Sequence, residues 1–258
     1  MRLDVYLYQN NFVKSRQKAK TLVESGNVMV NGKVVTKSSY EIDESLEYSI
    51  DISDDCQYVS RGGLKLEAIL KSASVDVSGL VCVDIGASTG GFTDCLLKNG
   101  AKKVFAVDSG TNQLDTSLKN DERVVSIENY NARNIDISLT GDLVDIITID
   151  VSFISQTLIM PNALKLLSEN GMYISLIKPQ FEVGRANIGK GGIVKNNGAI
   201  LTAIDNVFSV ANSFGFIPTH FIKSPILGGD GNTEFLAVFK RNGTQIHPNI
   251  IKNLVLNT

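Results

Sequence analysis

Apolar and polar positions follow two alternating patterns along most of the chain, and each change of pattern marks a predicted element. From Gly62 onward, short apolar runs alternate with segments whose apolar residues recur at helical spacing. The runs predict strands at Leu80–Ile85, Lys103–Val107, Arg123–Ile127, Asp145–Ile149, Met172–Ile177, Phe216–Ile222 and Glu234–Phe239. The helical spacing predicts helices at Gly62–Lys71, Gly90–Asn99, Gln156–Leu167 and Asn197–Asn212. This alternation is typical of a doubly wound α/β fold, a mostly parallel sheet with helices on both faces.

The first fifty residues have a different pattern. Leu3–Gln9 is a short amphipathic helix candidate, and Ser15 can cap a second helix, Arg16–Ser25, that stops at Gly26. Two alternating runs then meet at Asn31-Gly32, a strong signal for a β-hairpin. We therefore expect a small α+β domain with its linker at residues 1–58 and the large α/β domain at residues 59–258.

Charge separates the same two parts of the chain. The formal net charge is −2, but residues 1–40 hold seven Lys/Arg against two Asp/Glu, a net charge of +5. Residues 41–58 hold seven acidic residues and no basic ones. The overall balance therefore conceals a small basic module at the N-terminal end.

Composition excludes several classes of protein. The chain has 258 residues, of which 43% are hydrophobic and 20% charged, as in a globular protein with a sizeable core. Three scattered cysteines, Cys56, Cys82 and Cys95, with two histidines predict neither a disulfide framework nor a metal site. No signal-peptide core and no run near ~20 apolar residues occurs, so we expect a cytoplasmic protein without a membrane partner.

A glycine-rich turn follows the first predicted strand of the large domain. Asp84 ends that strand just before Gly86-Ala87-Ser88-Thr89-Gly90-Gly91, and Asp108 ends the next strand, as expected of an acid that holds a ribose hydroxyl. The spacing is not G-x-G-x-x-G, and an acid just before the turn suits S-adenosylmethionine better than a dinucleotide. A tight turn in which Asp84 only caps backbone amides is the alternative.

Four charged residues are expected at one edge of the sheet. Asp150 and Lys178 each close a predicted parallel strand, at the edge where α/β sheets bind ligands. A glycine-rich loop too short for a helical crossover joins the last two strands, so these pair antiparallel and Glu234 begins at that same edge. Lys65 lies in the first turn of the helix that precedes the first strand. Solvated element ends are the alternative for each residue alone.

Several motifs together resemble the TlyA, or hemolysin A, family. They are Ser60-Arg61-Gly62-Gly63-Leu64-Lys65-Leu66, Asp84–Phe92, Thr148-Ile149-Asp150-Val151-Ser152-Phe153-Ile154-Ser155, Lys178-Pro179-Gln180-Phe181-Glu182 and Gly189-Lys190-Gly191-Gly192. Members are S-adenosylmethionine-dependent ribosomal RNA ribose 2′-O-methyltransferases. Their catalytic part resembles the FtsJ group and follows an S4 RNA-binding domain, whose pattern is matched by Ser15–Ala19 and Val30–Lys33.

The resemblance implies a fold, a cofactor and a reaction. The fold is a Rossmann-like methyltransferase sheet with an antiparallel last strand, preceded by an α+β S4 domain. The implied reaction is ribose 2′-O-methylation of ribosomal RNA, at a cytidine, with rRNA or ribosomal subunits as partner. The implied catalytic tetrad is Lys65, Asp150, Lys178 and Glu234. The residues expected at S-adenosyl-L-methionine are Asp84, Gly86, Ala87, Ser88, Thr89, Gly90, Gly91, Phe92, Asp108 and Asp150.

The tetrad suits the chemistry of a ribose hydroxyl. This hydroxyl is a very weak acid, so it must lose its proton while it attacks a methyl group. A neutral lysine can accept that proton, and a neighbouring cation and desolvation favour the neutral form. Lys178 is the candidate base and Lys65 the neighbouring cation, while Asp150 and Glu234 orient the two lysines.

Further residues are expected to contact RNA. The candidates are Ser15, Arg16, Lys18, Lys20, Lys33, Arg61, Arg185 and Lys190. Arg185, Lys190 and Lys195 lie in a glycine-rich loop that could clamp phosphate, with a mobile surface loop as the alternative. Tyr58 and Phe181 are candidates for stacking on a base, although packing is the simpler expectation for Phe181.

Two other functions compete with methyl transfer. A non-catalytic RNA-binding or ribosome-assembly factor would keep the fold without the chemistry, and an intact tetrad argues against it. A cytolysin follows only from the family's historical name, and the sequence has no spanning segment to support it.

Overall fold

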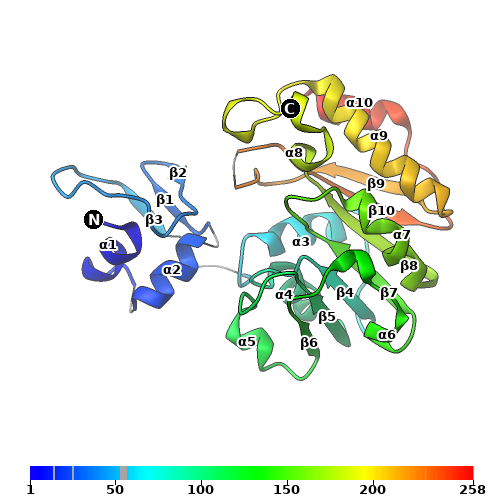
Figure 1. Ribbon diagram of the computed structural model, residues 1–258, viewed down its shortest axis with the longest axis horizontal. Coiled ribbons are helices and arrows are strands. Elements are labelled where there is room, and N and C mark those ends of the chain that lie inside the picture. Colours follow the sequence, from blue (N-terminus) through cyan, green and yellow to red (C-terminus); the bar gives the residue numbers. More distant parts are fainter. Residues whose placement is uncertain (14, 25, 53–56, 230, 258) are drawn as a thin grey trace. The chain divides into compact units, whose positions relative to one another are not determined.

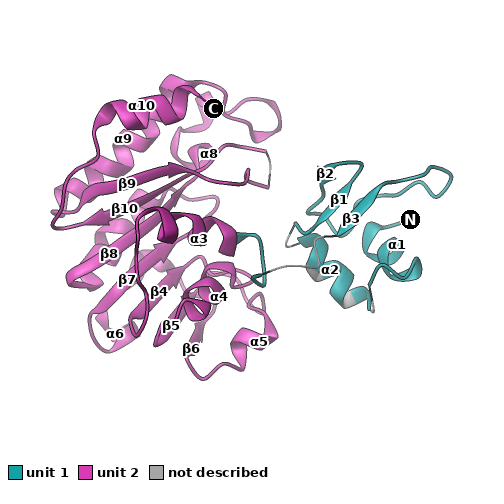
Figure 2. Cartoon of the chain, turned by 180° about the vertical axis from the view of Figure 1, so that it is seen from behind, with its two compact units in different colours: residues 1–62 teal, residues 63–258 magenta. Residues whose placement is uncertain are grey.

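The computed structural model describes residues 1–13, 15–24, 26–52, 57–229 and 231–257. The chain divides into two compact units, Met1–Gly62 and Gly63–Thr258 (Figure 2). The expected domain boundary after residue 58 falls four residues before this division. Ser25, where the second helix is expected to end, and the acidic segment 53–55 with Cys56 lie outside the described residues.

The first unit is a small α+β fold, as expected. Its elements are α1 (Leu3–Gln9), α2 (Arg16–Glu24), β1 (Val28–Val30), β2 (Lys33–Val34) and β3 (Ile50–Ile52). The strands form an antiparallel sheet in the order β2-β1-β3. Asn31 and Gly32 both have positive φ, 50° and 72°, so the predicted Asn-Gly hairpin is confirmed.

The core of the first unit is apolar, and a buried carboxylate of the same unit is paired with two arginines. Side chains of both helices and of β1 enclose it, among them Leu7, Leu22 and Val28. Asp4 is 2% exposed, and Arg2 and Arg16 both donate to its carboxylate. Burial alone would raise the pKa of Asp4, but these two guanidinium groups outweigh burial and hold it below its ordinary value.

The second unit contains the predicted large sheet. Among the described residues it has seven strands in the order β6-β5-β4-β7-β8-β10-β9 (Figure 1). Their bounds are β4 (Val81–Ile85), β5 (Lys103–Val107), β6 (Val124–Ile127), β7 (Val144–Ile149), β8 (Leu167–Ile177), β9 (Ile217–Lys223) and β10 (Phe235–Lys240). β10 pairs antiparallel with both β8 and β9, and the other pairs are parallel. The antiparallel last strand is therefore confirmed.

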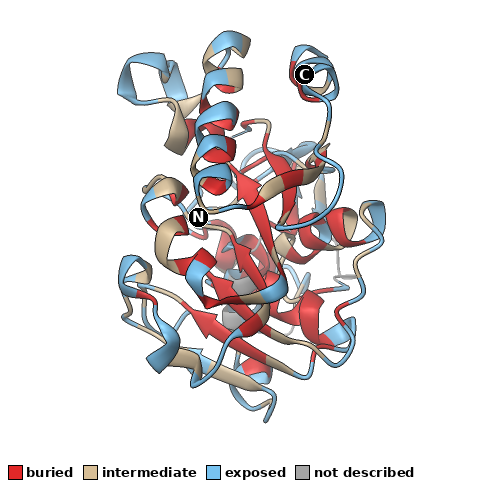
Figure 3. Cartoon of the chain, turned by 90° about the vertical axis from the view of Figure 1, so that its right-hand side faces the viewer, coloured by how far each residue is buried: buried red, intermediate tan, exposed pale blue. Residues whose placement is uncertain are grey.

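Both faces of this sheet are buried (Figure 3). Successive side chains of a strand point to opposite faces, so each strand contributes to two buried sets. One set, including Val83, Ile147 and Phe239, packs in a single cluster with α7 (Met160–Ala163), α9 (Asn197–Ser213) and α10 (Pro248–Leu256). The other set includes Cys82, Ile146 and Leu236, each 0% exposed. The helices α3 (Gly62–Ser72) and α4 (Gly91–Lys98) add their own buried stripes, and α4 packs on β4 and β5.

Three regions differ from the sequence-based expectation. The continuous helix expected at Gln156–Leu167 is wrong: the segment divides into η2 (Gln156–Leu158), α7 and η3 (Leu164–Leu166). Pro161 lies in the first turn of α7 and cannot donate a backbone hydrogen bond. β8 already begins at Leu167, and α10 was not expected at all. The remaining short elements are α5 (Thr116–Lys119), η1 (Ala132–Asn134), α6 (Ile137–Thr140), α8 (Pro179–Glu182), η4 (Arg185–Asn187) and η5 (Lys190–Gly192).

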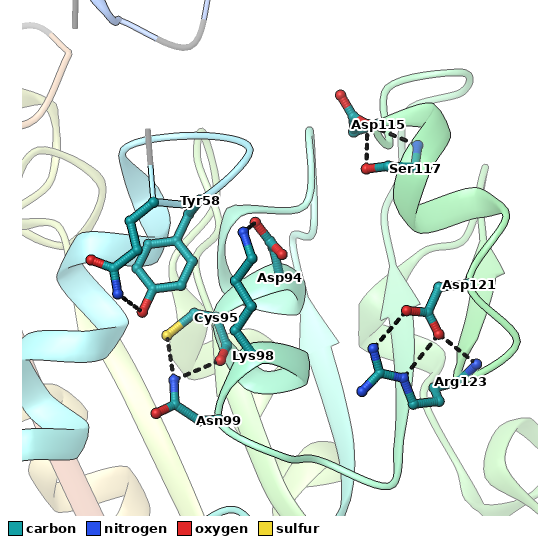
Figure 4. Close-up of polar contacts among 10 residues, drawn as sticks. Tyr58, Asp94, Cys95, Lys98, Asn99, Asp115, Ser117, Asp121 and Arg123 are labelled. Carbon is teal, nitrogen blue, oxygen red and sulfur yellow. Dashed lines mark hydrogen bonds and ion pairs between the residues drawn. The ribbon is translucent and has the colours of Figure 1, made fainter. Parts of the chain in front are cut away.

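Local polar contacts fix the helices on either side of β5 (Figure 4). On α4, Lys98 pairs with Asp94 at 2.8 Å, one helical turn away. Asp115 caps α5 by accepting from the backbone N–H of Ser117 at 2.8 Å. Such contacts stabilise each of these helices locally.

Candidate active site

The glycine-rich turn between β4 and α4 is shaped by a close approach of two chain segments. Gly86 has φ +83°, and a Cβ there would overlap the backbone carbonyl of Asp150. The amide of Asp150 in turn donates to Ile85 at 2.9 Å. The ends of β4 and β7 are therefore in direct contact, which only glycine at position 86 permits.

A cavity of about 680 Å³ opens above these strand ends. Its wall comes from the carboxyl ends of four neighbouring parallel strands: Gly86 after β4, Asp108 after β5, Asn131 after β6 and Asp150 after β7. Side chains such as Val107, Ile154 and Ile159 give it an apolar side. Its volume lies in the range of small-molecule sites, and its place is where open α/β sheets bind ligands.

Asp108 is held at the cavity wall by the backbone around it. Its Oδ2 accepts from the amide of Ser88 at 2.8 Å, and its Oδ1 accepts from the amide of Gly110 at 2.7 Å. These bonds join the ends of β4 and β5 and orient the carboxylate. A carboxylate has further lone pairs, so Asp108 can still accept hydrogen bonds from a ligand's hydroxyl groups.

Asp84 lies in a different environment. It is 0% exposed and does not line the cavity. Thr93 and Thr148 donate their hydroxyls to its two carboxylate oxygens, at 2.7 and 2.9 Å. Burial raises the pKa of Asp84 to about 6, despite these hydrogen bonds, and the nearby charge of Asp150 adds to the rise. Asp84 thus links β4 to α4 and β7 through hydrogen bonds below the turn.

The residues expected at the cofactor fall into two groups. Gly86, Ser88, Asp108 and Asp150 line the cavity, as do Asn131 and Arg133, which follow β6. Those that do not line it are Asp84, Ala87, Thr89, Gly90, Gly91 and Phe92. Ala87 and Phe92 are buried, and Gly90 begins α4 in the left-handed conformation. Sequence reasoning missed Ser109, Gln113 and Tyr130, because they follow strand ends without a motif.

Two residues of the expected tetrad, Lys65 and Glu234, form a buried ion pair. Lys65 from α3 donates to Glu234 Oε2 at 2.6 Å, and the two residues are 8% and 2% exposed. Glu234 directly precedes β10, whose reversed direction brings its first residue to the carboxyl edge of the parallel strands.

The other two residues of the tetrad form an ion pair nearer the cavity. Lys178, directly after β8, pairs with Asp150 Oδ1 and donates to Ser152 Oγ at 3.1 Å. Asp150 and Ser152 both line the cavity. One step beyond the last pair of β10 and β8, Phe235 with Ile177, the chain reaches Glu234 and Lys178, so the two ion pairs occupy neighbouring strand ends.

A polar network fixes the segment after β7 against α8. Glu182 accepts from the hydroxyl of Ser155 and from the amide of Gln156, the latter at 3.0 Å. Burial raises the pKa of Glu182 above its ordinary value, although these bonds oppose the rise. Along the chain, Ser155 and Gln156 closely follow the turn that carries Ser152 and Phe153.

Phe153 is the most unusual aromatic residue near the cavity, and sequence reasoning missed it. It lines the cavity yet is 93% exposed, and its φ of +65° is rare for a bulky side chain. Its ring contacts Phe181 with centroids 5.2 Å apart. The two rings therefore offer an apolar surface beside Asp150 and Lys178.

The residues expected at RNA lie in both units. Ser15 caps α2, since its hydroxyl accepts from the amide of Lys18 at 3.1 Å, and Arg16 pairs with Asp4. Lys18 and Lys33 are exposed, Lys20 lies 3.8 Å from Glu24, and Arg61 is half-buried. Arg185 and Lys190 are exposed in the loop after α8, whereas Tyr58 is only 3% exposed and offers little surface for stacking.

The described residues offer neither a membrane-spanning helix nor a cluster of metal ligands. None of their helices is both long and apolar enough to cross a bilayer. Within the same residues, no group of three or more His, Cys, Asp or Glu side chains is arranged to hold a metal ion.

Comparisons with known proteins agree with this architecture. The model of the FtsJ-like methyltransferase family matches residues 58–241, and the S4 domain model matches residues 1–47. The "Hemolysin A" of Brachyspira hyodysenteriae is 44% identical over 93% of this chain and 99% of its own length. The chain belongs to the TlyA, or hemolysin A, family of FtsJ-like methyltransferases.

For other similar proteins, the name states an activity or a structure has been solved. The "16S/23S rRNA (cytidine-2'-O)-methyltransferase TlyA" of Mycobacterium tuberculosis is 36% identical over 91% of this chain and 87% of its own. The solved structure named "Putative hemolysin from Streptococcus thermophilus" is 42% identical and superimposes with a TM-score of 0.78. It covers all of this chain and 94% of the other.

Proposed function

We propose that this TlyA-family chain transfers a methyl group from S-adenosylmethionine to a ribose 2′-hydroxyl of ribosomal RNA, at a cytidine. The activity printed for the Mycobacterium tuberculosis relative supports the substrate and the reaction. Methylation of ribosomal RNA implies a place where ribosomes are assembled, so cytoplasmic location belongs to the same proposal.

The observation that carries the proposal is that Asp150 belongs both to the cavity wall and to an ion pair of the tetrad. Its side chain lines the cavity at the strand ends and also pairs with Lys178, the neighbour of the buried Lys65–Glu234 pair. A methyl donor in the cavity and a hydroxyl beside Lys178 would thus meet at one residue. Proximity and alignment of the two reacting groups supply much of the rate enhancement in such transfers.

The cavity fits the proposed donor. Asp108 offers carboxylate oxygens to ribose hydroxyls, and Ile154 with Ile159 offers an apolar wall to an adenine ring. When bound, S-adenosylmethionine supplies an electrophilic methyl group on a sulfonium. Asp150 is close enough to the same cavity to orient the end of the donor that carries this group.

Lys178 is the proposed base. In its neutral form its amine would accept the proton that the 2′-hydroxyl loses on methylation. Asp150 and Ser152 fix the direction of the amine. Lys65 and Glu234 hold the end of β10 beside it.

The RNA would be held by two kinds of contact. The S4 unit, with Lys18 and Lys33 exposed, supplies phosphate contacts that fall with rising salt. The rings of Phe153 and Phe181 supply a surface on which an unstacked base can lie.

Mapping of ribose methylation tests the proposal. Ribosomal RNA from cells with and without the gene is compared at every nucleotide, and loss of methylation at defined cytidines is expected. The pattern should return with the wild-type chain but not with Lys178→Ala. Identical maps with and without the gene would contradict the proposal and favour a non-catalytic RNA-binding factor.

A deletion separates binding from chemistry. The chain without residues 1–50 should keep its affinity for S-adenosylmethionine but lose its salt-sensitive affinity for ribosomal RNA, since the exposed cations of the S4 unit are gone. Equal RNA methylation by the shortened and the full chain would remove the S4 unit from the proposal.

A further inference from the structure

The loop between α8 and α9 carries unpaired positive charge. This basic loop, residues 184–195, exposes Arg185, Lys190 and Lys195. In the described part of the chain, no acidic side chain forms an ion pair with any of these three. Exposed cations that are not neutralised by the protein itself are available to the phosphates of a nucleic acid.

One buried amide holds this basic loop. Asn232 is 2% exposed, and its Oδ1 accepts from the backbone N–H of Val194 at 2.9 Å. Its Nδ2 donates to the carbonyl of Gly192, also at 2.9 Å. The amide oxygen and the amide nitrogen of Asn232 thus each form a hydrogen bond to the backbone of the loop. We call this pair of bonds the bridge; it fixes both the position and the orientation of the loop backbone.

The same asparagine belongs to the turn that packs against Glu234. Asn232 lies two residues before Glu234, and its own carbonyl accepts from the amide of Gly228 at 2.9 Å. A Cβ at Gly228 would lie 2.5 Å from Glu234 Oε1, so the turn is closed tightly over this carboxylate. Hydrogen bonds and close packing thus link the loop at Gly192, through Asn232 and its turn, to the Lys65–Glu234 pair.

We propose that Asn232 is a positioning residue that couples phosphate binding by the basic loop to the geometry of the tetrad. The inference rests on the proposed function and adds to it a reason why RNA engagement and catalysis occur together. An RNA phosphate that draws the loop into place also sets Glu234, and through it Lys65. A displacement of about 1 Å can slow a reaction about 10²-fold when the reacting groups must align.

Two substitutions separate this coupling from mere loop order. Asn232→Ala removes both hydrogen bonds of the bridge. Asn187→Ala is the matched control: it removes an asparagine side chain from the same loop, whose amide donates to Val183 at 2.9 Å. Within the described residues, the side chain of Asn187 makes no hydrogen bond to the turn before Glu234.

Val194→Pro tests the bridge from its other end, should Asn232→Ala fail to fold. It deletes the backbone N–H from which Asn232 accepts a hydrogen bond, and it leaves the sequence of residues 228–234 unchanged. Ile193 has φ −87° and ψ 130°, which suits a residue before proline. If both variants act through one bridge, the double variant is no slower than the slower single one.

Two readouts are measured on the full chain. Trypsin cleaves after the exposed Arg185, Lys190 and Lys195, so its rate reports loop order. Single-turnover methyl transfer uses ribosomal subunits from cells that lack this protein, at saturating subunits and S-adenosylmethionine. We expect Asn232→Ala to speed loop cleavage about fivefold and to slow transfer about 10- to 100-fold. Asn187→Ala speeds cleavage but keeps transfer within about twofold.

Two outcomes would overturn the inference. Transfer by Asn232→Ala at the wild-type rate shows that the bridge does not reach the tetrad. An equal loss of transfer in Asn187→Ala shows that loop order alone is responsible. A wild-type chain that methylates no subunit contradicts the proposed function, a result distinct from either of these.

Discussion

Two sets of charged side chains share the carboxyl edge of the large sheet and differ in what surrounds them. The sealed set, Asp84, Lys65 and Glu234, is at most 8% exposed and does not line the cavity. The open set is Asp108, Asp150 and Lys178. The first two line the cavity, and Lys178 pairs with Asp150.

The contrast separates two functions of charge at a strand end. A sealed charge is satisfied by the protein itself, as Asp84 is by Thr93 and Thr148. Its removal should alter stability first, and turnover only through the geometry of the groups beside it. An open charge keeps lone pairs or protons for a ligand, so its removal should alter binding or turnover. The comparison predicts which measurement responds to which residue.

The largest effect is expected in the open set, at Lys178. Lys178→Ala removes the proposed base, and single-turnover methyl transfer should fall by ~10²–10⁴-fold. Lys178→Arg keeps the charge but cannot deprotonate near neutral pH, so it should be as slow as the alanine variant. RNA binding should change little in both. Near-normal transfer by the arginine variant would leave the lysine an electrostatic role only.

The next effect belongs to the sealed set and is a loss of stability. Lys65→Met leaves Glu234 buried without its cation, which should cost about 3–5 kcal/mol in the free energy of unfolding, measured with urea. Pairing it with Glu234→Gln should recover most of that loss. If the single variant is as stable as wild type but slow in transfer, Lys65 acts in the chemistry rather than in the architecture.

A pH-dependent effect is expected for Asp84. Burial raises its pKa to about 6 in the folded chain, so the folded state binds this proton more tightly than the unfolded state does. The stabilisation is complete below about pH 4 and is lost as pH rises through about 6. Asp84→Asn cannot lose a proton. From pH 4 to pH 7, the free energy of unfolding of wild type should therefore fall by ~2–3 kcal/mol relative to that of the variant. A constant difference across this range would contradict the sealed environment.

The smallest effect is expected at Asp108, in the affinity for the methyl donor. Asp108→Ala should weaken binding of S-adenosylmethionine by about 10- to 100-fold, measured by calorimetry with and without RNA. Asp108→Asn keeps one acceptor for the amides of Ser88 and Gly110 and serves as the control for a loosened turn. Unchanged affinity in a folded alanine variant would remove Asp108 from the donor site.

Strand ends could be predicted from the sequence, because apolar runs and their direction fix them. The positions of Asp150, Lys178 and Glu234 follow from that reasoning, including the reversal of β10. The sealed state of Asp84 could not be predicted. It depends on hydroxyls of Thr93 and Thr148, one on a helix and one on a neighbouring strand.

Local chemistry explains the other differences. Pro161 divides a segment whose apolar spacing alone predicts one helix. α10 begins at Pro248, directly after its N-cap His247, whose side chain accepts from the amide of Asn249. A proline in the first turn is a helix start that the sequence does contain. The bridge of Asn232 to residues forty positions away leaves no periodic signal, so only the structure reveals it.

The reversal of β10 also bears on how this fold can diversify. In a wholly parallel sheet, each connection at the ligand edge must lead back through a helix. Here the connection from Lys223 to Phe235 is a hairpin turn on that edge, because β9 ends and β10 begins there. Such a turn can be lengthened, shortened or grafted without disturbing a helical crossover. A change of length between Ser224 and Gly228 would leave the stretch that closes over Glu234 in place.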